Sequence, residues 1–300
     1  MGMATEASAR AQATGVILMC VGVASLSVND AIAKLLTERY SPLQILFMRN
    51  IIALPVAALL AWRFGGRGAL RSSRPLAHLV RGALWIVATV LFFTSISRMG
   101  LAEATALVFV APLFITALSA LFLAEPVGWR RWAAVLAGFV GVLIMIRPGA
   151  ESFRPISLMP VAVALVYAAL MLGARWLDPR ESVWTLMLYL SGTAAGLSAL
   201  IAPFFWTPIE AADLWLFGAI ALFGTAGMTM MTQAFRLAPA SVAAPLDYTA
   251  LIWATLLGWL IWRETPDGPA ILGAAVIVGA GGFVLWREHR LQGRPPQRGD

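Results

Sequence analysis

The chain has 300 residues, of which 60% are hydrophobic and 12% are charged, and its mean hydropathy is +0.81. Soluble proteins carry about 25% charged residues, so the composition excludes a soluble globular protein and leaves little room for an aqueous domain. The net charge of +7 does not indicate nucleic-acid binding, because Arg residues beside apolar spans are what the positive-inside rule produces. With one cysteine in the chain, no internal disulfide can form.

Apolar segments of about 20 residues, the length that crosses a bilayer, follow one another along the chain. They predict an all-α integral membrane protein with ten transmembrane helices. A cytoplasmic leader, residues 1–13, precedes them, and a basic cytoplasmic tail, residues 287–300, follows. The first five predicted spans are 14–36, 42–62, 79–97, 101–123 and 132–146, and the second five are 158–174, 183–206, 214–235, 240–261 and 269–286.

The Lys and Arg residues that flank these spans predict the orientation of the protein. If the N-terminus is cytoplasmic, most of them, including those in segments 63–81 and 287–298, lie on the cytoplasmic side. An excess of Lys and Arg marks the cytoplasmic side of a membrane protein. We therefore expect a multi-pass protein of the cell inner (plasma) membrane with both termini in the cytoplasm.

The two halves of the chain, residues 14–147 and 158–286, resemble each other. The stretch from Arg98 to Glu125 reads like the stretch from Arg236 to Glu264, and each is followed by a Gly-bearing last span. Because each half has an odd number of spans, the second half enters the membrane from the opposite side. The expected arrangement is an inverted repeat of five helices, which secondary transporters use to build a central site.

Several residue patterns recur in matching spans of the two halves or stand inside apolar spans. They are Asn29-Asp30, Lys34, Phe47–Arg49, Leu79–Gly82, Gly100–Ala104, Ala111–Phe114, Leu123–Glu125, Leu237–Ser241, Tyr248 and Trp262–Glu264. These patterns are similar to those of the EamA-type carriers of the drug/metabolite transporter superfamily, and the resemblance covers the chain from about Gly15 to Arg287. It implies two EamA-type five-helix repeats, in which helices one to four and six to nine surround the substrate cavity. The patterns look most like those of S-adenosylmethionine and riboflavin carriers, while amino-acid exporters share the same scaffold.

Three charged side chains lie inside the first two spans. A charged group at mid-bilayer depth costs about 2.5 to 3.5 kcal/mol on insertion scales, so such residues usually pair or line a polar cavity. Asp30 and Lys34 are spaced i,i+4 and share one helix face, and Arg49 lies at a similar depth in the second span. We predict that the three form a charge network that either contacts a zwitterionic or anionic ligand or acts as an outer gate. A structural clamp that holds the first helical hairpin is the alternative.

Two features of the second half extend this site. Asp247 is the one carboxyl group well inside a span of that half, and because burial disfavours its charged form, it is a candidate for coupling transport to protons. The alternative is a buried, hydrogen-bonded acid or a partner for Arg236. Pro112 and Pro245 lie in the corresponding fourth and ninth spans and are expected to kink them, as hinges for alternating access or as static bends.

Further candidates for the substrate site are polar or aromatic residues in or at the start of the spans. Aromatic faces suit a planar or cationic ligand, and packing against other helices or lipid is the alternative. The two histidines, His78 and His289, are read as lying in basic loops without a companion for metal binding or acid–base chemistry. The candidates are Asn29, Arg81, Trp85, Tyr167, Tyr189, Gln233, Tyr248 and Trp253.

The sequence contains no phosphate-binding loop, no metal-ligand motif and no Ser/His/Asp set. We therefore expect no cofactor or metal, and not an enzyme but a secondary transporter that moves a small polar metabolite by alternating access. Its partners would be a small-molecule substrate and the lipid bilayer, with the chain acting as a monomer or homodimer. By resemblance, the leading substrates are amino acids and their derivatives, including S-adenosylmethionine, followed by riboflavin-type vitamins. A polytopic membrane enzyme and a non-transporting scaffold are the alternatives of another class.

Overall fold

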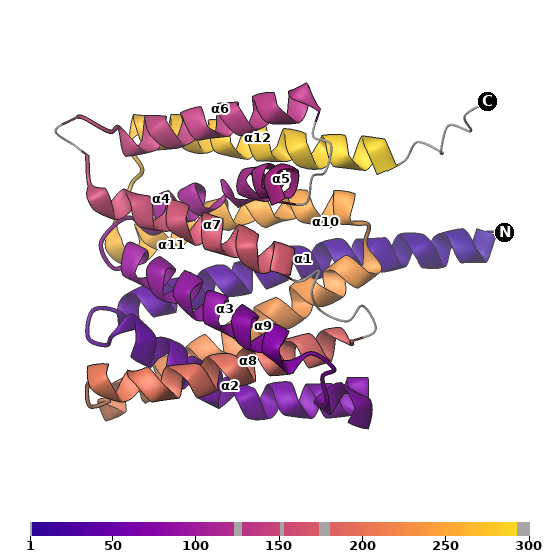
Figure 1. The fold of residues 1–300 in the computed structure, drawn as a ribbon, viewed down its shortest axis with the longest axis vertical. Helices are drawn as coiled ribbons and strands as arrows, with labels where there is room; N and C mark the ends of the chain where they lie inside the picture. Colours follow the sequence, from indigo (N-terminus) through magenta and orange to yellow (C-terminus); the bar gives the residue numbers. More distant parts are fainter. Residues whose placement is uncertain (1, 123–127, 151–152, 174–180, 293–300) are drawn as a thin grey trace.

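The computed structural model describes residues 2–122, 128–150, 153–173 and 181–292 (Figure 1). Within these ranges the regular secondary structure is helical and contains no β-strand. Seven helices of the described part are long and apolar enough to cross a membrane. The chain is thus an all-helical membrane protein, as its composition predicts. Glu125 and the end of the predicted tail, 293–300, lie outside the described residues.

The helices run between two opposite faces of the molecule. We call the face where α1 begins and α12 ends the terminal face, and the face where α1 ends and α2 begins the distal face (Figure 1). The helices of the first half are α1 (Gly2–Leu36), α2 (Pro42–Gly65), α3 (Pro75–Ile96), α4 (Leu101–Val108), α5 (Ala111–Phe122) and α6 (Trp129–Ile146). Those of the second half are α7 (Leu158–Gly173), α8 (Val183–Ile201), α9 (Leu214–Leu237), α10 (Ala240–Leu246), α11 (Ala250–Trp262) and α12 (Gly268–Gln292).

Short 3₁₀ turns connect several of these helices, and one of them divides a predicted span. Predicted span 240–261 is split into α10 and α11 by the turn Asp247–Thr249. Predicted spans 132–146 and 269–286 correspond to the shorter apolar helices Trp132–Ile146 and Gly268–Val284. The other seven predicted spans each correspond to a helical segment of membrane-crossing length. The remaining 3₁₀ turns are Arg67–Leu70, Pro155–Ser157, Ala202–Phe205 and Ala211–Asp213.

The two spans with predicted proline kinks are both interrupted, although the prolines do not lie at the interruptions. The chain leaves helical geometry at Phe109 and Val110, between α4 and α5, and again at the Asp247–Thr249 turn. Pro112 lies in the first turn of α5, where its missing N–H removes no intrahelical hydrogen bond. The two breaks lie against each other, because the ring centroids of Phe109 and Tyr248 are 4.8 Å apart.

The most extensive helix contacts join elements from different halves of the chain. These pairs are α1 with α9, α2 with α8, α3 with α7, and α6 with α12. Figure 1 shows α6 and α12 side by side at one end of the molecule and α2 with α8 at the other. In the α1–α9 contact the backbones approach closely, since a Cβ atom on Gly227 would lie 2.9 Å from the Gly22 carbonyl oxygen. The halves are therefore interleaved.

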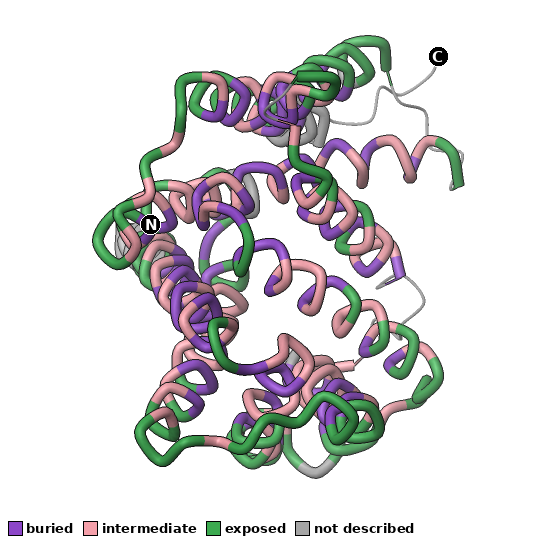
Figure 2. Tube along the Cα trace, turned by 90° about the vertical axis from the view of Figure 1, so that its left-hand side faces the viewer, coloured by how far each residue is buried: buried purple, intermediate pink, exposed green. Residues whose placement is uncertain are grey.

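Burial follows this arrangement. Buried residues face neighbouring helices, and exposed residues cover the outer helix surfaces and the loops (Figure 2). Large apolar side chains such as Leu59, Leu136 and Leu222 are exposed on the outside of α2, α6 and α9. An apolar outer surface of this extent fits contact with lipid, which solvates hydrocarbon without penalty.

Candidate functional site

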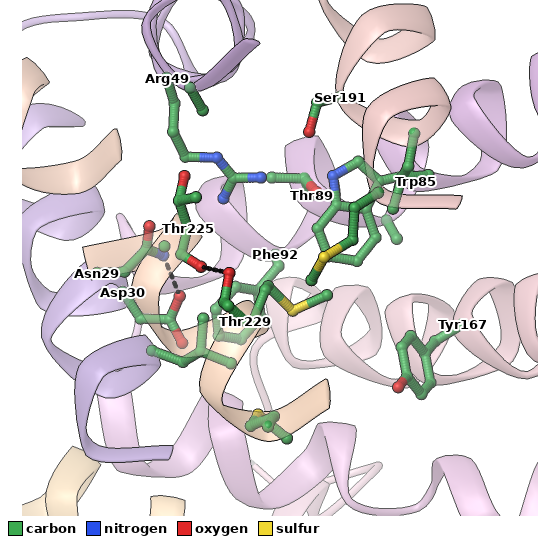
Figure 3. Close-up of a pocket in the computed structure, with 18 of the residues that line it drawn as sticks. Asn29, Asp30, Arg49, Trp85, Thr89, Phe92, Tyr167, Ser191, Thr225 and Thr229 are labelled. Atoms are coloured by element: carbon green, nitrogen blue, oxygen red, sulfur yellow. Dashed lines mark hydrogen bonds between the residues drawn. The ribbon is translucent and has the colours of Figure 1, made fainter. Parts of the chain in front are cut away.

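The helices surround a cavity of about 340 Å³, within the size range of small-molecule sites (Figure 3). Both halves of the chain line it, through α1 to α4 from the first and α7 to α9 from the second, together with the Asp247–Thr249 turn and Ala250 at the start of α11. The charged residues of its lining are Asp30, Arg49 and Asp247. Most of the remaining lining is aliphatic, aromatic or methionine.

Asp30 and Arg49 place opposite charges on adjoining parts of the cavity wall. In Figure 3 the guanidinium of Arg49 extends from α2 into the cavity, on the side where α1 carries Asn29 and Asp30. The Asn29 amide donates a hydrogen bond of 3.0 Å to one carboxylate oxygen of Asp30. No hydrogen bond or ion pair joins Asp30 to Arg49 among the described residues, so polar atoms of both remain available to a ligand.

An aromatic wall adjoins these charges. The guanidinium carbon of Arg49 lies 5.9 Å from the ring centroid of Trp85, a cation–π distance. Phe92, about two helix turns further along α3, continues the wall, and Tyr167 of α7 lies further along the cavity (Figure 3). The cavity thus combines an acid, a base and flat apolar surface.

Asp247 contributes a second carboxyl group from the turn between α10 and α11. The predicted alternative, in which Asp247 pairs with Arg236, is not what the structure contains. The Arg236 guanidinium instead lies 5.9 Å from the Trp184 ring centroid. Within the described part of the chain, Asp247 makes no ion pair, and its carboxyl group faces the cavity.

Lys34 lies outside the cavity lining, so the structure divides the predicted three-residue network. Its Nζ atom forms an ion pair with Glu264 and donates a hydrogen bond of 2.9 Å to the backbone oxygen of Met99. Glu264 is 230 positions away in the chain, so spacing alone could not identify it as the partner. Asp30 and Arg49 face the cavity, whereas Lys34 belongs to the next layer toward the distal face.

Five other predicted site residues lie outside the cavity lining: Arg81, Gln233, Tyr248, Trp253 and Tyr189, which contacts His78. Arg81 lies close enough to Tyr167 for electrostatic interaction, and Gln233 lies on α9. The Tyr248 ring points away from the cavity toward α12, where a Cβ atom on Gly281 would lie 2.0 Å from its Oη. Trp253 is 36% exposed on the outside of α11. Because most side chains of these spans are apolar, hydropathy alone does not distinguish the inner face of each helix from its outer face.

The interpretation of the histidines as loop residues is wrong, because His78 lies in the first turns of α3 and His289 lies in α12. His78 also has a companion: its Nε2 atom lies 2.8 Å from the Glu181 carboxylate. Its ring centroid lies 4.6 Å from that of Tyr189, one of the site candidates from the sequence. Burial alone would raise the pKa of Glu181, but hydrogen bonds from Ser72, His78 and Ser73 lower it to about 2. This cluster, which we call the terminal clasp, joins the α2–α3 connection to the residues before α8.

Small polar residues of the cavity wall were not selected from the sequence. Thr89, Ser191, Thr225 and Thr229 add hydroxyl groups to the lining (Figure 3). Thr229 donates its hydroxyl to the Thr225 backbone oxygen at 2.7 Å. The i,i+4 spacing of the two threonines on α9 is the signal that could have revealed this polar stripe.

Comparison with known proteins adds to this geometry. The chain matches the EamA-like transporter family over residues 13–147 and again over 154–286. It is 28% identical over 280 residues to an S-adenosylmethionine uptake transporter of Rickettsia bellii, covering 92% of this chain and 94% of the relative. It is 33% identical over 226 residues to a riboflavin transporter of Vibrio cholerae, covering 73% and 74%. A solved protein structure with 21% identity covers 95% of this chain and 99% of its own with a TM-score of 0.61, which shows a shared fold.

Proposed function

The chain belongs to the EamA-like transporter family of membrane carriers, and we propose that its substrate is a zwitterionic amino-acid derivative with an additional positive charge. S-adenosylmethionine is the leading example. The named relatives are transporters of small metabolites, and this chain transports a small metabolite as well. We also propose that the carrier lies in the cell inner membrane.

The observation that supports this substrate class is the combination of charges in the cavity. The planar guanidinium of Arg49 fits a carboxylate, and the Asp30 carboxylate fits an ammonium group. By formal charge the lining holds two carboxyl groups and one guanidinium, which balances a ligand with two positive groups and one negative group. S-adenosylmethionine has this set, as ammonium, sulfonium and carboxylate, and its adenine ring would stack on the Trp85 wall.

Riboflavin is the second candidate, and a specific observation favours it. The wall of Trp85, Phe92 and Tyr167 offers flat apolar area, and the Vibrio cholerae riboflavin transporter is 33% identical to this chain. However, riboflavin has no charged group to balance Asp30, Arg49 and Asp247. Burying charges without partners is costly, so the charges favour the first candidate.

Counterflow in proteoliposomes tests the proposal. Vesicles loaded with unlabelled S-adenosylmethionine are expected to accumulate labelled S-adenosylmethionine, and Asp30→Asn or Arg49→Gln is expected to reduce kcat/KM at least about tenfold, or about 1.4 kcal/mol. Asp267→Asn is the matched control, because Asp267 pairs with Arg147 at the distal face. Counterflow by riboflavin alone, or normal transport by Asp30→Asn, would refute the substrate class.

We also propose that the carrier has ten membrane-crossing segments in two inverted five-helix repeats, residues 14–147 and 158–286. Two observations support this: the family matches the chain twice, and exchanging the halves maps the helix contacts onto one another. The α1–α9 contact maps onto α7–α3, while α2–α8 and α6–α12 map onto themselves. Since one chain supplies the whole cavity lining, a monomer or a homodimer of independent carriers would suffice.

Asp247 is proposed to couple transport to a proton gradient, and the breaks near Pro112 and Pro245 are proposed as hinges. The position of Asp247 in the cavity, without an ion-pair partner among the described residues, supports the first role. The mutual contact of the two breaks supports the second. Asp247→Asn is expected to remove the pH dependence of uptake. An unchanged pH profile in that variant would contradict the coupling.

A further inference from the structure

Glu264 joins three helices at the distal face through one carboxyl group. One oxygen accepts a hydrogen bond from Lys34, at the end of α1. The other accepts a hydrogen bond of 3.0 Å from the backbone N–H of Leu101, at the start of α4. Glu264 itself lies two residues after the end of α11. The Trp262 ring covers Lys34, whose Nζ lies 4.8 Å from the ring centroid. We call this cluster the distal lock.

The distal lock lies between the cavity and the distal face. Asp30 lines the cavity, and Lys34 lies one helix turn beyond it. On α4, Thr105 lines the cavity, and Leu101 lies one helix turn closer to the distal face. In the other direction the lining extends to Trp184, the second residue of α8, at the terminal face. A path from the cavity to the distal face along α1 and α4 therefore has to pass the lock.

Two other contacts join the halves, one at each face of the molecule. At the distal face, Tyr40 donates to Asp213 at 2.8 Å, and at the terminal face the terminal clasp holds Glu181 and His78. Both contacts are formed together with the distal lock in this conformation. The distal lock instead joins α1, α4 and α11, three helices that all contribute to the cavity wall.

Lys34 needs an acidic partner as long as its side chain is buried. Its side chain is 8% exposed, and a buried ammonium without a partner is strongly destabilising. If α11 moves away from α1, Glu264 leaves with it. Asp30 is then the carboxyl group within reach, because residues spaced i,i+4 are neighbours on a helix. Its second carboxylate oxygen accepts no hydrogen bond from the described residues.

We propose that Lys34 is a gating residue with two positions, paired with Glu264 when the distal face is closed and with Asp30 when it is open. This inference rests on the proposed function, because the ammonium group of the substrate and Lys34 would compete for the same Asp30 carboxylate. A bound substrate then returns Lys34 to Glu264 and favours closure of the distal face. An empty, distal-open carrier keeps its cavity charge neutralised by its own lysine.

The gating role of Lys34 is tested by chemical labelling of a cysteine placed on the cavity side of the distal lock. Thr105→Cys, in a Cys20→Ser background, places a thiol in the cavity one turn inside the lock. Its reaction with a membrane-impermeant maleimide is measured in right-side-out and in inverted membrane vesicles without substrate. Using both orientations makes the result independent of the proposed topology, and omitting substrate makes it independent of the substrate class.

Lys34→Met and Glu264→Gln are expected to accelerate labelling from the distal side about fivefold or more, the lower range of measured coupling between sites. Lys34→Arg should not accelerate it. Arg147→Met is the matched control, because it removes a different distal ion pair, to Asp267, and it should leave labelling unchanged. Unchanged labelling in Lys34→Met and Glu264→Gln would overturn the gating role, whether or not melting temperature falls.

The second position of Lys34 is tested by a double-mutant cycle. Asp30→Asn is expected to slow distal labelling in the parent, because it removes the partner that stabilises the open state, and to have no effect beside Lys34→Met. Additive effects of the two substitutions would overturn the exchange of partners. Failure of S-adenosylmethionine counterflow with this labelling pattern intact would instead refute the proposed substrate and leave the lock standing.

Discussion

Trp85 and Trp253 are the same side chain in two different surroundings. Trp85 lines the cavity and lies against Arg49, whereas Trp253 is 36% exposed on the outside of α11. A tryptophan in the cavity can stack on a ligand and hold the neighbouring guanidinium. One on the outside contacts lipid. The substitution of each by alanine therefore separates ligand contact from general loss of aromatic area.

Trp85→Ala is expected to raise KM by about five- to thirtyfold, because a desolvated cation–π or stacking contact is worth about 1 to 2 kcal/mol. Trp253→Ala should leave KM unchanged. Initial uptake rates over a range of substrate concentrations measure both. Equal effects of the two substitutions on KM would show that Trp85 has no special contact with the ligand.

Glu181 gives the terminal face a defined dependence on pH. Its folded pKa of about 2 lies below the ordinary value of about 4.3, so its contribution to stability is present above about pH 4.3 and is lost as pH falls toward 2. Glu181→Gln should therefore lower the melting temperature by a constant amount from pH 7 to 5, and by less below pH 4. Glu210→Gln, which removes an exposed partner of Arg39, should change little at any pH. A Glu181→Gln gap that widens in acid would contradict this account.

The residues show how far a sequence alone could define the site. Asp30, Arg49 and Asp247 could be selected because a charge inside an apolar span is rare and costly, and all three line the cavity. Lys34 satisfied the same criterion, yet its partner Glu264 comes from the other half of the chain. The sequence thus shows which charged residues are buried inside the membrane. It does not show which partner each one has, because that depends on which helices are in contact.

Among the elements, α6 and α12 pack with their backbones close together. A Cβ atom on Gly273 would lie 2.6 Å from the Gly141 carbonyl oxygen and 2.3 Å from Met145 Cγ. Glycine at both positions permits this approach, as in membrane helix pairs generally. Gly279, also in α12, has nothing within 4 Å of a Cβ position.

Gly273→Ala is expected to destabilise the protein by about 1 to 3 kcal/mol, the usual cost of overpacking, because the new methyl group meets backbone that cannot move aside alone. Gly279→Ala makes the same chemical change without a clash and should have little effect. Thermal unfolding in detergent measures both variants. The α6–α12 contact would not be tight if Gly273→Ala melted like Gly279→Ala.

The sequence also indicated which spans would bend, although not where. Proline in the fourth and ninth spans predicted kinks, and both spans are interrupted. The breaks occur at Phe109–Val110 and Asp247–Thr249, after the helices α4 and α10, where the aromatic rings of Phe109 and Tyr248 meet. The first break lies in the turn before Pro112, where a proline disrupts helical geometry. The second break follows Pro245, which is not the side on which a proline disrupts its helix.

At the scale of the whole molecule, hydropathy was sufficient to predict the fold class but not to predict which residues line the cavity. Apolar runs identify membrane helices because every backbone polar group has to be satisfied inside its own helix. The wall of the cavity, in contrast, draws on α1 to α4 and α7 to α9. Which face of each helix turns inward depends on pairings such as α1 with α9, and these join residues far apart in the chain.

The orientation of the molecule determines which compartment the distal lock faces. The Arg residues of segment 63–81 lie toward the terminal face, where α12 also ends, and the positive-inside rule places such a face in the cytoplasm. In a Cys20→Ser background, Pro208→Cys reports on the distal face. Gly68→Cys reports on the terminal face, where a Cβ atom has open space.

In intact cells, an impermeant maleimide is expected to label Pro208→Cys and to spare Gly68→Cys until the membrane is permeabilised. With that result, Lys34 and Glu264 close the external side and the cavity of this conformation extends toward the cytoplasm. Labelling of Gly68→Cys alone in intact cells would show that the protein has the opposite orientation in the membrane. The distal lock would then close the cytoplasmic side, and the charge bias of the loops would have failed as a guide to orientation.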